Sequence, residues 1–323
     1  MYWIFYVILA LLVLSTPVLS AAITADHSTV TDFATIPPSI IDAIAADYHI
    51  YYVHTSHGSQ IISGISMVES EDAAYDPPYY YEVSDDLGHN GDTSWVPNTR
   101  TYLNAHPECD MAMFSWCGGC SDNTEEGINI YLNKMEELEA DYPKVTFIYM
   151  TGHLDGTGVA GNLYLRNNQI RDYCMANDKI LFDFADIESY DPEGVYYPDE
   201  TDYCNWCTAW CAAHPADCPA CGGCAHSQCF NCFQKGKAWW WMMATISGWS
   251  PSVSECGDAN SDGTLNVGDA TYLIGYVFKG GIGPSPLCRG DANGDGSINI
   301  GDVVYLINYV FKNGDPPIEP CCL

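Results

Sequence analysis

The stretch HIYYVHTSHGSQIISG, residues 49–64, decides how the first part of the chain folds. Its apolar run at 50–53 is typical of a buried strand, Gly58 suits a sharp turn, and isoleucines then recur at helical spacing. The stretch therefore predicts a strand, a turn and a helix in succession. Because such a turn presents its side chains at the carboxyl end of a sheet, Ser56 is a candidate nucleophile.

Length and composition indicate one sizeable domain and a smaller one, because the chain has 323 residues and 47% of them are hydrophobic. Acidic residues number 42, against 11 basic ones. A surface this negative repels phosphate, so nucleic acid is not an expected partner.

The N-terminal residues 1–20 are apolar and are followed by small residues, as in a secretory signal peptide, although no Lys or Arg precedes the apolar run. An uncleaved membrane anchor is the alternative, but the run is shorter than the roughly 20 residues that a span needs. We expect signal removal to leave an extracellular protein without a stable membrane span. Export also accounts for the 16 cysteines, most of which should form disulfides in an oxidising compartment.

Two segments near the C-terminus, GDANSDGTLNVGDATYLIGYVFKGG from residue 257 and GDANGDGSINIGDVVYLINYVFKNG from residue 290, repeat one pattern. Each begins with Asp, Asn and Asp at alternating positions before a glycine turn, and a further Asp closes the loop, as in calcium-binding EF-hands. Oxygen ligands at these spacings are what calcium requires. The predicted ligands of two calcium ions are Asp258, Asn260, Asp262, Thr264, Asn266 and Asp269 in the first loop, and Asp291, Asn293, Asp295, Ser297, Asn299 and Asp302 in the second.

Each loop is followed by an apolar helix pattern, and residues 249–256 form a linker by composition. A loop and a helix, repeated once, with Asp rather than Glu at the closing position, resemble a type I dockerin, which we assign to residues 257–320. The resemblance implies a calcium-folded module that binds the cohesin domain of a scaffold or cell-surface protein. A module this small buries little apolar surface, so calcium should supply much of its folding free energy.

Residues 21–248 alternate strand and helix patterns. Apolar runs at 110–119, 145–156 and 179–191 lead into polar, glycine-containing turns, and a helical pattern lies at 123–143. This alternation predicts an α/β fold, a parallel sheet flanked by helices on both faces in a flavodoxin-like three-layer sandwich. Ligands of such sheets bind at the carboxyl ends of the strands.

The order of motifs in this domain resembles the SGNH (GDSL-type) hydrolase superfamily: a serine after the first strand, a later glycine turn, GHLD in place of the G-x-N-D block, and a histidine before the last helix. The resemblance implies acyl transfer, with a nucleophile, an oxyanion glycine, a third-block aspartate and a general base at Ser56, Gly118, Asp155 and His226. Leu154 replaces the usual asparagine, and Gly223 replaces the usual acid before the base. Asp217 could orient the base, the site could work as a dyad, or His214 could be the base.

Beside a dockerin, this resemblance predicts a serine esterase or deacetylase that acts on polysaccharide. Two alternatives stay open. The domain could be an inactive SGNH-like binding or structural module, because Leu154 and Gly223 depart from the pattern. It could also be a metal-dependent deacetylase whose ligands are His54, His57, His153 and Asp155.

The segment 204–232 holds eight closely spaced cysteines. C-x-x-C pairs are typical of structural zinc sites in cytosolic proteins, whereas disulfides are expected after export. Both interpretations fix a loop just before His226, and spacing alone does not determine which cysteines pair. The motif WCGGC at 116–120 could be a redox pair, although such motifs usually open a helix near the start of a chain.

Overall fold

The structure, a computed structural model, describes residues 22–250, 256–261, 264–312, 314–318 and 321. The chain divides into two compact units, Met1–Trp249 and Ser250–Leu323. The predicted signal peptide lies outside the described residues, and so does most of the predicted linker. Among the helices of the described ranges, none combines the length and the apolar character that a bilayer span requires.

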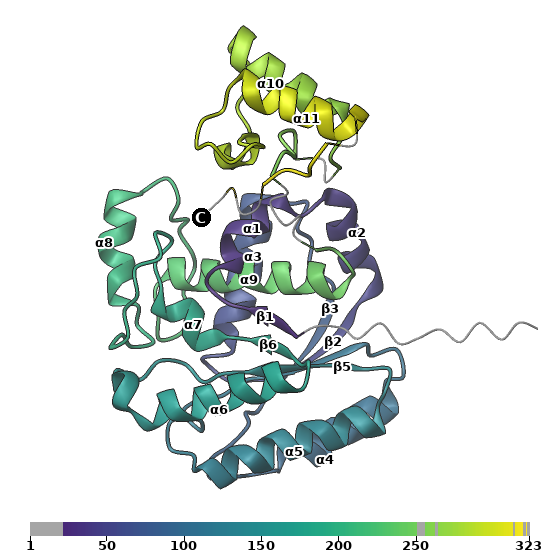
Figure 1. The fold of residues 1–323 in the computed structure, drawn as a ribbon. Coiled ribbons are helices and arrows are strands. Elements are labelled where there is room, and N and C mark those ends of the chain that lie inside the picture. The colour runs from purple at the N-terminus through teal and green to yellow at the C-terminus, as the bar shows by residue number, and fades with distance from the viewer. Residues whose placement is uncertain (1–21, 251–255, 262–263, 313, 319–320, 322–323) are drawn as a thin grey trace, which may run out of the picture. The chain divides into compact units, whose positions relative to one another are not determined.

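Six parallel strands form the sheet of the first unit, in the order β1-β6-β5-β4-β2-β3 (Figure 1). The strands are β1 (Ile23–Ala25), β2 (His49–His54), β3 (Tyr79–Ser84), β4 (Met111–Phe114), β5 (Thr146–Met150) and β6 (Ile180–Phe182). Neighbouring residues of a strand point to opposite faces, and both faces are apolar: in β4, Met113 joins one core and Phe114 the other. The predicted α/β class with a parallel sheet is confirmed.

Helices cover both faces of this sheet, as Figure 1 shows. One face carries α1 (Thr29–Asp32), α2 (Pro38–Asp47), α3 (Ser59–Glu71) and α9 (Cys229–Ile246), and the other carries α4 (Trp95–Ala105), α5 (Glu125–Asp141) and α6 (Asn162–Ala176). Two short 3₁₀ turns are η1 (Phe33–Thr35) and η2 (Gly158–Ala160). The resulting three layers leave the ends of the strands as the natural place for loops that carry function.

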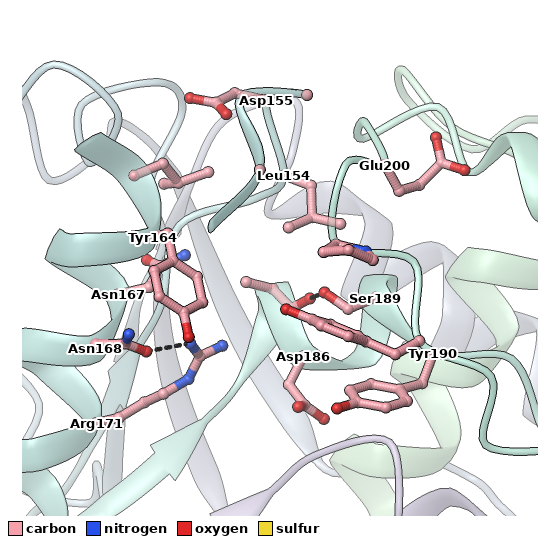
Figure 2. Close-up of a pocket in the computed structure, with 16 residues that line it drawn as sticks. Leu154, Asp155, Tyr164, Asn167, Asn168, Arg171, Asp186, Ser189, Tyr190 and Glu200 are labelled. Atoms are coloured by element: carbon pink, nitrogen blue, oxygen red, sulfur yellow. Dashed lines mark hydrogen bonds between the residues drawn. The ribbon is translucent and has the colours of Figure 1, made fainter. Parts of the chain in front are cut away.

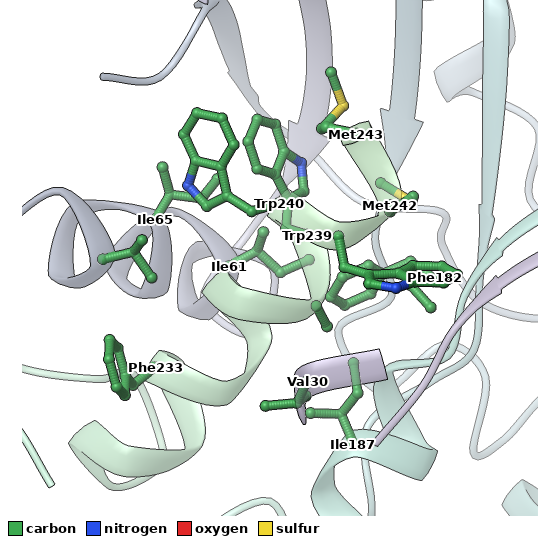
Figure 3. Close-up of a cluster of buried hydrophobic side chains, with 14 of the residues drawn as sticks. Val30, Ile61, Ile65, Phe182, Ile187, Phe233, Trp239, Trp240, Met242 and Met243 are labelled. Carbon is green, nitrogen blue, oxygen red and sulfur yellow. The ribbon is translucent and has the colours of Figure 1, made fainter. Parts of the chain in front are cut away.

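Helix α9 is almost wholly buried and packs against α3 (Figure 3). Its Trp240 and Met242 belong to the same apolar core as Ile61 of α3. The two helix backbones touch at Gly64 and Gly236, since a Cβ added at Gly64 would lie 2.6 Å from the Gly236 nitrogen. Small residues at the crossing therefore bring α9 against the helix that follows the Ser56 turn.

The cysteine-rich segment follows α7 (Phe184–Ser189), contains α8 (Asn205–Ala213) and runs into α9. All eight of its cysteines form disulfides, in the pairs Cys204–Cys207, Cys211–Cys218, Cys221–Cys229 and Cys224–Cys232. No thiolate of this segment is left to bind zinc, so the disulfide interpretation replaces the zinc one. Two of the pairs, Cys221–Cys229 and Cys224–Cys232, link the segment to the first turns of α9.

The second unit contains α10 (Val267–Lys279), a 3₁₀ turn η3 (Leu287–Gly290) and α11 (Ile300–Lys312), with each predicted calcium loop preceding one of the two α-helices. The disulfide Cys256–Cys321 joins its two ends. Its core is small and centres on Leu273 and Leu306, one from each helix. The second unit has the predicted all-helical form.

Candidate functional site

The carboxyl ends of β2 and β4 lie at the switch point of the sheet. The chain leaves β2 for β3 at one edge, whereas it leaves β4 for β5 in the opposite direction. Loops that diverge in this way leave room for a ligand in open α/β sheets. The loop after β2 carries Ser56 and His57, and the loop after β4 carries Cys117.

The turn after β2 is held in place by the residues that surround it. Tyr52 Oη donates a hydrogen bond to the Gly58 carbonyl at 3.0 Å, and a Cβ added at Gly58 would lie 2.3 Å from Ser115 Oγ. Glycine is therefore required at this position by packing. The turn leaves Ser56 half-buried and directs His57 inward, where only 7% of the residue is exposed.

His57 lies at the centre of the site and contacts four other side chains. Its Nδ1 lies 3.3 Å from Cys117 Sγ, and its Nε2 lies 3.0 Å from Asp202 Oδ2. Its ring stacks on that of His153 with the centroids 3.6 Å apart, and on that of His226 at 4.5 Å. One imidazole thus connects a thiol to a carboxylate while two more imidazoles pack against it.

The pKa of His57 is lowered to about 4, first because the ring is buried and next because His153 lies beside it. His226 adds to this effect, whereas the Asp202 carboxylate opposes it. The ring is therefore neutral at neutral pH and can accept a proton.

Cys117 is the one partly exposed thiol among the described free cysteines, Cys109, Cys117, Cys120 and Cys174. Its Sγ also lies 3.5 Å from Ser56 Oγ. Cys120, the other cysteine of the WCGGC motif, is buried, donates to Asn167 Oδ1 at 3.3 Å, and does not pair with Cys117. The loop between them is packed tightly, because a Cβ added at Gly119 would lie 1.9 Å from the Gly88 carbonyl oxygen.

A buried ion pair supports the loop that carries His153. Lys235 Nζ of α9 donates to Glu188 Oε1 of α7 at 2.8 Å, and neither side chain has exposed surface. The second oxygen of Glu188 accepts the backbone N–H of Leu154 at 2.8 Å. Leu154, which occupies the usual asparagine position, is thereby bound through its backbone instead of offering a side-chain donor.

The same ion pair reaches the loop that carries His226. Lys235 Nζ also donates to the side-chain oxygen of Gln60 in α3. The amide nitrogen of Gln60 in turn donates to the Ala225 carbonyl at 2.6 Å. Since Ala225 precedes His226, the buried network positions both histidines that stack on His57.

Three site residues predicted from the sequence lie on loops at this edge of the sheet: Ser56, Gly118 and His226. In the part of the chain that the structure describes, no hydrogen bond joins Ser56 to His226. Ser56 contacts Cys117, and His226 stacks on His57. Gly118 follows Cys117 with a φ of +87°, a conformation that glycine adopts readily.

Several other sequence candidates lie in separate interactions. His54 Nε2 contacts Glu82 Oε2 at 2.8 Å, and the Asp155 carboxylate accepts hydrogen bonds from the backbone and side chain of Thr157. His214 Nε2 lies 3.5 Å from Glu193, outside the His57 cluster.

Sequence reasoning missed Asp202, which holds the second nitrogen of His57, and the pairing of that ring with Cys117. Asp202 lies in an acidic stretch, PDETDYC, that matches no motif, and 145 positions separate it from His57. The position of Cys117 directly after a core strand is a signal for a nucleophile, which the redox interpretation of WCGGC does not use.

His57, His153 and Asp202 could also hold a metal ion, because their ligand atoms lie within 4.8 Å of one another. His153 Nε2 is buried and has no hydrogen-bond partner among the residues that the structure describes. Two imidazoles and a carboxylate are a ligand set that zinc accepts. Of the metal ligands predicted from the sequence, His57 and His153 belong to this group, and His54 and Asp155 do not.

A pocket of about 250 Å³ is lined by Leu154 and Asp155, which follow His153, and by Glu200 (Figure 2). The segment 154–156 pairs with residues 200–202, since the Asp202 N–H donates to the Leu154 carbonyl at 3.1 Å and the Gly156 N–H to the Glu200 carbonyl at 3.2 Å. The paired segments separate this pocket from the His57 cluster. Aromatic and polar side chains line it, among them Tyr164, Asn168, Arg171, Asp186, Tyr190 and Tyr196.

The two loops of the second unit have the form of calcium sites. Their closing aspartates, Asp269 and Asp302, are fully buried at the start of α10 and α11. Burial raises the pKa of Asp302, and the neighbouring carboxylates of Asp291 and Asp295 add to the effect. Acidic groups that crowd together in this way are stabilised by a cation, so the residues fit calcium. The predicted ligand Asp262 lies outside the described residues.

Residues 256–311 match the family model of the dockerin type I domain, so the second unit contains a dockerin, as the repeats predicted. Dockerin domains bind calcium. No curated protein matches the chain. Among solved structures, the chain is similar to a protein described as a GDSL-like lipase from Parabacteroides merdae, with 12% identity and a TM-score of 0.37, over 62% of this chain and 96% of that one.

Proposed function

We propose that the large domain hydrolyses acyl esters on polysaccharide, and that the dockerin attaches it to a cohesin outside the cell. The observation that carries the hydrolase is the set of contacts around His57. A base within hydrogen-bond reach of a nucleophile, with an acid on its second nitrogen, is the arrangement that acyl transfer needs. His57 meets that description with Cys117 and Asp202 at 3.3 and 3.0 Å.

Two nucleophiles compete for the reacting position in this proposal. Ser56 is the nucleophile expected from the sequence, and Cys117 Sγ lies 3.5 Å from its hydroxyl. The contacts favour His57 over His226 as the base, because His57 touches a nucleophile directly. The backbone N–H of Gly118 is suited to the oxyanion, since it follows Cys117 in a tight loop.

Polysaccharide is the favoured substrate class because of the neighbouring pocket. Tyr164 and the partly exposed Tyr196 offer aromatic surface for sugar rings, whereas Tyr190 is already stacked on His27 and Tyr196. Asn168, Arg171 and Asp186 offer polar groups for the sugar hydroxyls. The pocket and the His57 cluster share a wall made by the segments 154–156 and 200–202. A polysaccharide chain that continues past this wall would bring a further, acylated sugar to the cluster.

The attachment part of the proposal rests on the dockerin match. Dockerins bind cohesins, and dockerin-bearing proteins are usually extracellular or bound to the cell surface. The disulfides of the large domain agree with an oxidising compartment. Capture of the full chain by an immobilised cohesin should require calcium and be lost in EGTA. Capture that is unaffected by EGTA would contradict calcium-dependent attachment.

The hydrolase is tested by measuring acetate release from acetylated xylan and from acetylated manno-oligosaccharides. The full chain should release acetate, and the double variant Ser56→Ala/Cys117→Ala, which lacks both nucleophiles, should lose about 10³-fold in kcat or more. Ser66→Ala is the matched control, because Ser66 is exposed on α3 and contributes nothing to the cluster. Equal acetate release by wild type and the double variant would contradict a covalent mechanism here, and no release by wild type would favour a binding module.

A second candidate is metal-assisted deacetylation, which the proximity of His57, His153 and Asp202 favours. A metal bound there would supply Lewis-acid activation of water. The three side chains would hold the ion, with the backbone of Leu154 fixed by Glu188 behind His153. Dialysis against EDTA should then abolish acetate release and added Zn²⁺ should restore it. Full activity after EDTA treatment rules this candidate out.

A further inference from the structure

Three side chains from distant parts of the chain form one continuous relay. Cys117 Sγ lies 3.3 Å from His57 Nδ1, and the other ring nitrogen, His57 Nε2, lies 3.0 Å from Asp202 Oδ2. A thiol at one imidazole nitrogen and a carboxylate at the other leave the ring a single proton-accepting position, which faces sulfur. This is the geometry of a nucleophile, a base and an orienting acid.

From this relay we propose that Cys117, rather than Ser56, is the nucleophile of the large domain, and that it attacks the acyl esters of the proposed hydrolase. The inference deepens the proposed hydrolase and rests on it. Cys117 contacts the base, whereas the Ser56 hydroxyl contacts Cys117 itself. Ser56 is a positioning residue in this assignment, because its hydroxyl can donate to the sulfur as negative charge develops there.

The surroundings of Cys117 suit a reactive thiol. It is partly exposed, whereas Cys109, Cys120 and Cys174 are buried. Burial raises the pKa of Cys109 to about 11 and the pKa of Cys120 and of Cys174 to about 12, so these three stay protonated and unreactive. Reagents that modify thiols should therefore act on Cys117 first among the described free cysteines.

The reaction balances without any further reagent. As the sulfur attacks the acyl carbonyl, the thiol proton moves to His57 Nδ1, and Asp202 stabilises the charged ring. The C–S bond forms, the ester C–O bond breaks, and the ring proton passes to the leaving alcohol. Water then attacks the acyl thioester, gives its proton to His57, and the acid leaves as the thiol is restored. The sum is ester plus water giving acid plus alcohol.

The first test compares single variants of the full chain for acetate release. Cys117→Ala should reduce kcat by about 10³-fold or more, whereas Ser56→Ala should cost about tenfold or less, because it removes only a hydrogen bond to sulfur. The reverse order, with Ser56→Ala inactive and Cys117→Ala active, would overturn the assignment and leave the proposed hydrolase intact. No release by wild type would count against the hydrolase itself.

The second test does not depend on knowing the substrate. Iodoacetamide is added to the folded full chain, and the rate of labelling at Cys117 is followed by mass spectrometry of the peptide that contains it. Labelling of Cys117 should be at least about tenfold slower in His57→Gln than in wild type, because the thiol loses its base. Equal rates in both proteins would overturn the relay. Circular dichroism of each variant shows whether the fold is kept. If Cys117→Ala does not fold, the conservative variant Cys117→Ser replaces it in the acetate-release test.

A trapped intermediate gives a third readout. Brief incubation of wild type with p-nitrophenyl acetate, followed by acid quenching, should place one acetyl group on the Cys117 peptide, and neutral hydroxylamine should remove it. An acetyl group found on Ser56 instead, stable to neutral hydroxylamine, would identify the serine as the nucleophile and contradict the proposal.

Discussion

At the scale of single residues, His57 determines the chemistry of the large domain. Its imidazole is buried, and it is contacted by Cys117, Asp202, His153 and His226 from four separate loops. Each contact limits what the ring can do: the carboxylate orients it, the neighbouring rings keep it neutral, and the thiol offers it a proton.

The pKa of His57 predicts how stability depends on pH. The unfolded residue titrates near 6.5 and the folded one near 4, so between these values the unfolded chain binds a proton that the folded chain does not. The free energy of unfolding should therefore fall as pH drops through this window, with His57 contributing about 3 kcal/mol. Urea titrations at pH 7, 6, 5 and 4, followed by tryptophan fluorescence, measure this fall.

His57→Gln is the matched variant for that experiment, because glutamine does not titrate. Its unfolding free energy should fall less between pH 6.5 and 4 than that of wild type. The groups that face the ring, Cys117, Asp202, His153 and His226, remain in the variant. Parallel pH profiles for the two proteins would show that the folded state protonates His57 normally.

Lys235 carries a second prediction at this scale. Replacing Lys235 with Met leaves the buried carboxylate of Glu188 without its ion-pair partner, which costs about 3–5 kcal/mol in the free energy of unfolding. Urea unfolding measures this loss. Adding Glu188→Gln should recover part of it, because the unpaired charge is gone and an acceptor for the Leu154 N–H remains. Lys144→Met, at an exposed position, is the control and should change little.

At the scale of elements, the contact between α3 and α9 holds the site together. Helix α3 starts beside His57, and the loop before α9 carries His226. Where the helices cross, glycine backbones meet in place of side chains. The disulfides Cys221–Cys229 and Cys224–Cys232 attach the loop to the first turn of α9. The position of the His226 loop is therefore set by the position of α9 against α3.

Gly64→Ala tests this contact. The added methyl group would lie 1.9 Å from the Cys232 carbonyl oxygen, which is backbone and cannot rotate away. We expect a loss of about 3 kcal/mol or more in the free energy of unfolding, measured by urea titration, because the two helices must separate. Gly222→Ala is the control, since a Cβ there meets no atom of the described residues within 4 Å. Equal stability of the two variants would show that the helices cross less closely than described.

At the scale of the whole molecule, the two units have separate cores and different sources of stability. The first unit fills both faces of a six-stranded sheet. Among the described residues of the second unit, the apolar core cluster is built on six buried side chains, Ala259, Ala270, Leu273, Ala292, Val303 and Leu306. So small a core leaves calcium and the Cys256–Cys321 disulfide to supply the remaining stability.

Calcium removal should therefore unfold one unit and spare the other. In EGTA the full chain should lose the circular-dichroism signal of α10 and α11, which have 13 residues each. Tryptophan fluorescence should not change, because all nine tryptophans precede residue 250. Asp302→Ala should raise the calcium concentration needed for refolding, whereas Lys279→Ala, outside the loops, should not. A helical signal that is the same in EGTA and in calcium would contradict calcium-coupled folding.

The sequence by itself determined the calcium loops, because all ligands of one loop lie within twelve successive residues and their spacing is set by local backbone geometry. It also determined the α/β class, since strand and helix periodicities are local too. Only the tertiary structure brought Cys117 and Asp202 to His57, across 60 and 145 positions, and chose the disulfide partners in the segment 204–232. Contacts of this kind depend on how the strands are ordered and where their loops end, which residue spacing does not encode.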